Sequence, residues 1–289
     1  TYNTAVGALA GEKVTTGIQN TLIGGLAGDA ITTASNNAAF GYSALGANST
    51  GTLNTAIGSG ALFSNTTASN NTAVGTNSLL ANTTGTFNVA VGSLAGDANT
   101  TGNYNTALGY NSFGINTTGS NNVAIGALAL DSNTTASDNV AVGVNALGVN
   151  TEGNLNVSIG GQSLSTNTVG DRSVAVGYGT LSAQNPASDA DMYNTAVGYA
   201  AGVAVTTGTN NTLIGGLAGD AITTASNNSA LGFNSFSANT TGENNVALGS
   251  YALNQNTTAA NNTAVGHFAL TANTTGSTST AVGASALTA

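Results

Sequence analysis

A 17-residue repeat runs through the whole chain and constrains its fold more than any other feature. Copies of a motif close to NTAVG begin at Asn3 and Asn20 and recur at the same interval as far as Ser173. After a slip of four residues the series resumes at Asn194 and continues to Ser279. A fixed period of this kind is typical of solenoids, in which each repeat forms one coil that stacks on its neighbours.

We number the positions of each copy from 1 to 17, starting at the asparagine. Position 4 is Val, Ile, Leu or Phe in all 17 copies, position 3 is Ala in 14, and position 9 is Leu or Phe in 12. Position 5 is always glycine, which suits a corner where φ is positive or where two backbones approach closely. These glycines are Gly7, Gly24, Gly41, Gly58, Gly75, Gly92, Gly109, Gly126, Gly143, Gly160, Gly177, Gly198, Gly215, Gly232, Gly249, Gly266 and Gly283.

The repeat predicts an all-β fold, a parallel β-solenoid (β-roll) of 17 coils. Each coil should contain a short strand at positions 1 to 4, the glycine corner, a second short strand around positions 8 and 9, and a turn at the Asn-Thr-Thr-Gly segment. In five copies position 9 is Gly, and four of these carry leucine at position 7. Because residues two apart share one face of a strand, this exchange favours β structure over helix.

The four-residue slip divides the array. Residues 1–184 hold coils 1 to 11, residues 185–193 form a slip or loop region, and residues 194–289 hold coils 12 to 17. The segments that start at Asn20 and Asn211 share 18 identical letters, and neither end shows the atypical polar coil that caps a finished solenoid. We therefore expect this chain to be a segment of a longer fibre.

Stacking in register predicts rows of like residues along the coils. Asparagine is the commonest residue at position 12, where side-chain amides should form a ladder between coils. The ladder includes Asn48, Asn65, Asn82, Asn99, Asn116 and Asn133. Four copies instead carry Val or Ile at position 12 together with Gly at position 9, and these predict a second coil type with a rearranged interior.

Alternation along the strand places positions 2 and 4 on one face and the alanine of position 3 on the other. A solenoid with a single core needs only one apolar face, so the alanine face should meet something else. We expect close approach by another copy of the chain in a parallel homotrimer. A solvated alanine face on a monomer is the alternative.

Composition excludes several classes of partner. Only 4% of the residues are charged, the net charge is −9, and Lys13 and Arg172 are the only strong cations. Binding to a phosphate backbone needs clusters of Lys and Arg, so nucleic acid is excluded as a partner. No apolar run approaches the roughly 18 residues of a membrane span. The absence of cysteine rules out a disulfide framework.

Catalytic and metal chemistry have few candidate residues. The single histidine, His267, lies at variable position 6, and its nearest acid in sequence is Glu243. We therefore expect a protein that is not an enzyme and holds no cofactor. Asp189 and Asp191 in the slip region are weak metal candidates. Gly-Asp pairs at other coils leave a calcium-stabilised surface-layer or matrix protein as a remote alternative.

Threonine and aromatic residues suggest further functions. The Thr-Thr pair at positions 13 and 14 would form two rows similar to those of ice-binding solenoids, which makes ice binding the main alternative function. Exposed aromatic residues would bind glycans or other surfaces, or would cover the coil corner. They include Tyr42, Tyr110, Tyr178, Tyr199, Phe233 and Tyr251. Asn-x-Thr triplets such as Asn65-Thr66-Thr67 follow from the repeat itself.

The motifs SVAVG at Ser173, NVAIG at Asn122 and NTAIG at Asn54 resemble the head repeats of YadA-like trimeric autotransporter adhesins and repeats of phage tail fibres. The resemblance implies a trimeric, left-handed parallel β-roll with a binding role at a cell or virion surface. The repeats here are longer than those of adhesin heads. We expect the shaft of an extracellular fibre or adhesin, whose main partner is itself and whose further candidate partners are host-surface glycans or proteins.

Overall fold

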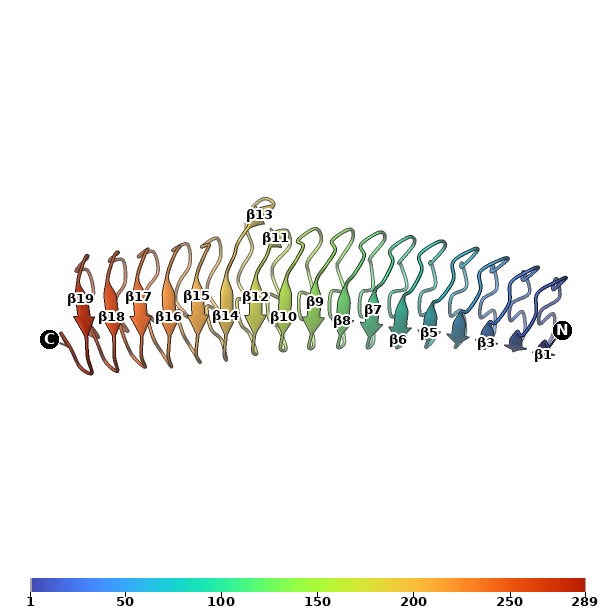
Figure 1. Ribbon diagram of the computed structural model, residues 1–289, viewed down its shortest axis with the longest axis horizontal. Coiled ribbons are helices and arrows are strands. Elements are labelled where there is room, and N and C mark those ends of the chain that lie inside the picture. Colours follow the sequence, from blue (N-terminus) through green and yellow to red (C-terminus); the bar gives the residue numbers. More distant parts are fainter. Residues whose placement is uncertain (1, 289) are drawn as a thin grey trace. The chain divides into compact units, whose positions relative to one another are not determined.

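Short parallel strands, stacked one coil apart, make up the architecture of this computed structural model (Figure 1). The structure describes residues 2–288, and within them it contains strands and turns but no helix. Contacts divide the chain into two units, Thr1–Val144 and Asn145–Ala289, and each is described by itself. The predicted all-β parallel solenoid is confirmed.

The first unit contains nine three-residue strands, counted over residues 2–144, and each strand pairs in parallel with the next. Every partner lies 17 residues further along the chain, so that Val89 pairs with Thr106. The strands are β1 (Thr4–Val6), β2 (Thr21–Ile23), β3 (Ala38–Phe40), β4 (Thr55–Ile57), β5 (Thr72–Val74), β6 (Val89–Val91), β7 (Thr106–Leu108), β8 (Val123–Ile125) and β9 (Val140–Val142).

The second unit continues the same pattern and also absorbs the four-residue slip. Its stacked strands are β10 (Val157–Ile159), β12 (Val174–Val176), β14 (Thr195–Val197), β15 (Thr212–Ile214), β16 (Ser229–Leu231), β17 (Val246–Leu248), β18 (Thr263–Val265) and β19 (Thr280–Val282). Val174 still pairs with Thr195, so the stack keeps its register across the slip. The extra residues form a loop in which β13 (Ala190–Asp191) pairs with β11 (Gly170–Asp171), beside the main stack (Figure 1).

The alanine of position 3 lies inside the coil, contrary to the prediction that it faces another chain. Ala90 and Ala141 have no exposed surface, whereas the strand residues on either side of them point outward. The physical reason is competition for interior space, because the side chains at positions 3 and 9 point into the same volume. Most coils combine Ala at position 3 with Leu at position 9.

The second coil type shows this competition directly. In one such coil position 3 is Leu22 and position 9 is Gly28, and a Cβ added to Gly28 would lie 2.8 Å from both Leu22 Cδ2 and Ile31 Cδ1. In this coil the exchange is therefore between positions 3, 9 and 12. The leucine at position 7 does not replace the missing side chain, since none of Leu9, Leu26, Leu94 and Leu217 is buried. The predicted shift by two positions along a strand is wrong.

The segment around positions 8 and 9 is a series of turns rather than a second strand. Ala44 and Leu45 are adjacent and both fully buried, which the alternation of an extended strand does not allow. Leu45 and Ser43 both have φ of 54°, in the left-handed region. The coils are nevertheless hydrogen-bonded here, since the Leu45 backbone N donates to the Ala61 carbonyl of the next coil at 3.0 Å.

Candidate interaction surfaces

The asparagines of position 12 form a buried, fully bonded row. Asn116 Nδ2 donates to Asn99 Oδ1 at 2.7 Å, and Asn133 Nδ2 donates to Asn116 Oδ1 at 2.9 Å. Within its own coil the Asn116 amide also bonds to both the carbonyl and the N–H of Gly119. Equivalent bonds link Asn48, Asn65, Asn82 and Asn99. Since a buried amide must satisfy all its donors and acceptors, this row fixes the register of the coils.

The asparagines of position 1 form a second buried row with a different bonding pattern. The Asn71 Oδ1 accepts a bond from the Asn88 backbone N at 2.9 Å, and Asn71 Nδ2 donates to the Gly85 carbonyl. Here side chains bond to backbone as well as to one another. Burial also argues against glycosylation of the Asn-x-Thr triplets in the folded chain, because Asn65 and Asn82 have no exposed surface to receive a sugar.

The glycine corner brings consecutive coils into close backbone contact. The corner glycines have φ between 128° and 140°, a conformation that residues with a Cβ rarely adopt. A Cβ added to Gly92 would lie 2.4 Å from the carbonyl oxygen of Gly109. Both the backbone conformation and the spacing of the coils therefore require glycine at position 5.

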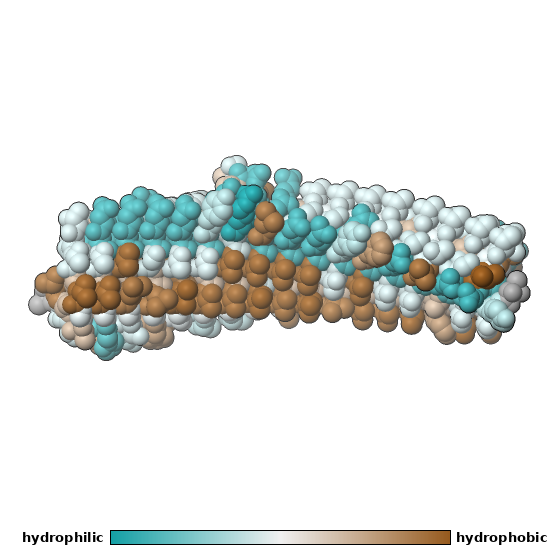
Figure 2. All heavy atoms as spheres, viewed as in Figure 1, coloured by the Kyte–Doolittle hydropathy of each residue, from teal (hydrophilic) through white to brown (hydrophobic). Residues whose placement is uncertain are grey.

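The outward side of the strands is a continuous uncharged surface in each unit. We call it the strand face, and it consists of the first and third residues of β1 to β10, β12 and β14 to β19. All of these residues are Thr, Val, Ile, Leu, Phe, Ala or Ser. Figure 2 shows hydrophobic side chains gathered in a band along the coils. Val91 is 39% exposed and Leu231 is 47% exposed. Large exposed apolar surfaces of this kind mark interaction sites.

The predicted aromatic residues lie on the exterior, partly in contact with one another. Tyr178 and Tyr199, at position 6 of consecutive coils, stack with ring centroids 6.1 Å apart. Phe233, Tyr251 and His267 belong to a second cluster together with Phe268, whose ring lies 4.1 Å from that of His267. Tyr42 packs over Gly25, with its Cδ2 3.6 Å from the place where a glycine Cβ would stand. The aromatic rings therefore cover the coil surface and also remain open to solvent.

The two threonine rows differ in what their hydroxyls do. At position 13 the Thr100 Oγ1 donates to the Thr117 carbonyl of the next coil at 2.8 Å, and the same bond recurs from coil to coil. At position 14 the side chains of Thr84, Thr101 and Thr118 are exposed. The pair therefore diverges, with the threonines of position 14 exposed and most side chains of position 13 half-buried.

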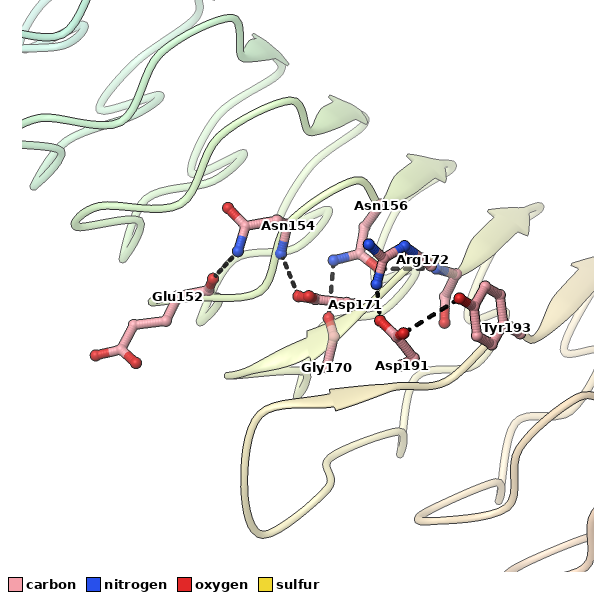
Figure 3. A network of polar contacts seen from close by, with 9 residues as sticks. Glu152, Asn154, Asn156, Gly170, Asp171, Arg172, Asp191 and Tyr193 are labelled. Atoms are coloured by element: carbon pink, nitrogen blue, oxygen red, sulfur yellow. Dashed lines mark hydrogen bonds and ion pairs between the residues drawn. The ribbon is translucent and has the colours of Figure 1, made fainter.

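Beside the slip loop lies a connected group of charged and polar side chains (Figure 3). Arg172 forms an ion pair with Asp191, and its guanidinium lies 5.8 Å from the centre of the Tyr193 ring. Asp191 also accepts a bond from the Tyr193 hydroxyl, while Asp189 is exposed in the loop. An aspartate that already pairs with an arginine is a poor cation ligand. Over residues 2–288 the structure holds no group of three His, Cys, Asp or Glu side chains placed to bind a metal.

Three aspartates at position 10 are partly buried, and burial raises the pKa of each carboxyl. They are Asp97, Asp131 and Asp220, and Asp131 additionally raises the pKa of Asp97 through charge repulsion. A raised pKa in the folded state means that protonation favours folding. This contribution is fully present below the unfolded value of 3.8 and is lost as pH rises through the higher folded values.

Replacing Asp131 by Asn should therefore reduce the pH dependence of stability. The Asp131 Oδ1 accepts a bond from Asn111 Nδ2, and an amide oxygen keeps that acceptor without the charge. We expect Asp131→Asn to be as stable as the wild type or slightly more stable at pH 7, with a smaller gain on acidification towards pH 4. Urea unfolding midpoints at pH 7 and pH 4 measure this. If the midpoint of the variant changes between the two pH values as much as that of the wild type, the prediction is wrong.

The residues of position 17 were not predicted as functional. Their backbone conformation is left-handed, and they border the strand face. Their φ values lie between 49° and 62°, a region that Asn and Asp tolerate best. Asn or Asp occupies about half of these positions. Five others carry exposed bulky residues, at a backbone cost of about 1–2 kcal/mol each. These are Leu53, Phe87, Tyr104, Leu155 and Tyr193. The sequence signal that could have identified this position is that asparagine, common at position 17, is replaced by large apolar residues in some repeats.

Comparisons with known proteins place no family name on this solenoid. A scan against protein-family models found no match, and neither a search of curated proteins nor a search of solved structures found a similar chain. Over the described residues, no helix has the length and apolar character needed to cross a membrane. The class that the fold defines is therefore a β-solenoid repeat protein.

Proposed function

We propose that this chain forms the structural shaft of an extracellular fibre or adhesin, in a cell-surface appendage or a phage tail fibre that mediates attachment. The observation that carries the proposal is the bonding between coils. The strands, the turns and the buried asparagines are each hydrogen-bonded to their equivalents in the neighbouring coil. Val89 illustrates this for a strand, Leu62 for a turn and Asn82 for the asparagine row. An array held together at every rung resists local opening, which suits a part that transmits force and resists proteases.

We further propose that copies associate through their strand faces as a homotrimer. The strand face has no charged residue, and a second copy offers a surface with the same rung spacing of about 4.8 Å, so each contact repeats along the axis. The strand width and rung spacing give roughly 800 Å² of strand face per chain, summed over the two units. The resemblance to trimeric adhesin repeats supports the same number of chains.

Charge placed on the strand face tests this association. The triple variant Val74→Lys/Val91→Lys/Leu108→Lys brings ammonium groups together on consecutive coils of each copy. We expect the wild type to have the mass of three chains and the variant to dissociate more than about 100-fold more readily, because like charges across an interface cost several kcal/mol. Multi-angle light scattering measures the mass.

A matched control carries the same three charges elsewhere. Thr84→Lys/Thr101→Lys/Thr118→Lys alters exposed side chains of position 14 on neighbouring coils, and it should keep the wild-type mass. Circular dichroism should show the same β content for both variants. A wild-type chain with the mass of one copy at all concentrations would refute the proposed association.

Ice binding is a second candidate, and a specific observation moves it to the strand face. Outward threonines begin nine of the strands, as Thr55 and Thr72 do, and paired threonines stand one rung apart in the parallel sheet. Both candidates need the same surface, so a chain that buries it in an oligomer cannot present it to ice. Thermal hysteresis of the dissociated strand-face variant Val74→Lys/Val91→Lys/Leu108→Lys and of the wild type distinguishes the two functions.

A further inference from the structure

Two aromatic residues of position 17 are strained where the fold does not need them. Phe87 and Tyr104 have φ of 58° and 57°, and they are 48% and 59% exposed. Asn70 and Asn121 hold the same position in the flanking coils with φ of 62° and 60°. Each side chain leaves about half of its surface exposed in a left-handed conformation, so it gains less from its own coil than a buried residue would, which points to a function outside the coil.

The backbone bonds at this position are the same with either residue type. The Tyr104 N donates to the Thr86 carbonyl at 3.0 Å, and the Asn121 N donates to the Asn103 carbonyl at 3.0 Å. Asparagine therefore satisfies the coil fully. What the aromatic residues add is the stack itself, with ring centroids 5.0 Å apart and ring planes within 5° of parallel.

The stacked pair adjoins the strand face. Position 17 lies two residues before the first outward strand residue, so its Cα is within about 7 Å of that residue's Cα. The strands concerned are β6 and β7, and Val89 and Val91 of β6 are both exposed. The rings thus widen the uncharged strand face at its amino-terminal edge. Exposed aromatic residues beside an apolar surface are the usual anchors of protein interfaces.

We propose that Phe87 and Tyr104 are anchor residues of the contact between two copies of this chain, with their stacked rings packing against the strand face of the second copy. This inference rests on the proposed self-association. We infer that a second copy of the chain covers this surface. The surface is uncharged and repeats at the rung spacing, and the same surface on another copy has both properties.

The double variant Phe87→Asn/Tyr104→Asn tests the inference in the full chain. It installs the residue that neighbouring coils already use, so each coil keeps its bonds and loses its strain. We expect the unfolding midpoint at low protein concentration to stay the same or rise, while self-association weakens at least tenfold in sedimentation equilibrium. The control Phe63→Ser removes an exposed aromatic residue at position 10, beyond the coil corner, and should leave association unchanged.

The experiment distinguishes failure of the anchor role from failure of the proposed self-association. A wild-type chain that never associates overturns the self-association and this inference together. A double variant that associates as tightly as the wild type overturns only the anchor role. A lower unfolding midpoint of the dissociated variant would show that the rings stabilise their own coils, and it would also overturn the inference.

Discussion

Replacing Gly160 by Ala should destabilise the second unit by about 3–5 kcal/mol, a large effect for a single methyl group. Gly160 has φ of 129°, and an added Cβ would lie 2.4 Å from the carbonyl oxygen of Gly177 in the next coil. That oxygen belongs to backbone, which cannot move aside without separating two coils. The Gly177 N–H bond to Ile159 at 2.7 Å would be lost with it.

The control for this variant is another glycine of the same unit. Gly179 also has a positive φ, of 65°, but no atom lies within 4 Å of an added Cβ. Gly179→Ala therefore carries only the backbone cost, about 1 kcal/mol. Urea unfolding followed by circular dichroism compares the two midpoints. Equal shifts would show that backbone conformation alone, and not the approach of the coils, requires the corner glycine.

Replacing Asn116 by Asp should cost about 3–5 kcal/mol at pH 7, because it places an unpaired carboxylate in a buried row. Asn116 Nδ2 donates to Asn99 Oδ1 and to the Gly119 carbonyl, and a carboxylate turns both bonds into repulsions between oxygen atoms. Burial would raise the pKa of the introduced carboxyl. Its protonated form can donate one bond, so part of the lost stability should return as the pH falls from 7 towards 4.

Asn121→Asp in the same coil is the matched control. Asn121 is exposed at position 17, and the equivalent residue one coil later is Asp138. We expect a midpoint within the error of the wild type at pH 7. Should Asn116→Asp behave like this control, the amide row would not determine the register of the coils.

Much of the architecture could be predicted because the repeat leaves few alternatives. Gly92 and its equivalents, Val91 and its equivalents, and the 17-residue interval predicted parallel stacking, and the structure pairs the strands at that interval. The row that contains Asn116 was also expected from register, and its members bond from coil to coil. These features follow from the period and the composition, because stacking places the residue at each position next to its equivalent in the neighbouring coils.

The candidate surfaces depended on information that the repeat does not contain. Strand alternation says that Ala90 and Val91 point to opposite sides, but it does not say which side is interior. The second predicted strand failed at Ala44 and Leu45 because left-handed residues turn two adjacent side chains inward. The strain at Phe87 was likewise invisible, since a residue's φ is not written in its identity.

The sequence by itself therefore determined the class of fold, the interval of the coils and the positions that must be glycine or asparagine. Only the tertiary structure decided which strand surface is buried and which is presented to a partner. The physical reason is that one coil encloses a limited interior volume, and either Leu22 with Gly28 or alanine with leucine can occupy it. Which side chains share that volume depends on how the turns close the coil, and that closure is a property of the folded chain.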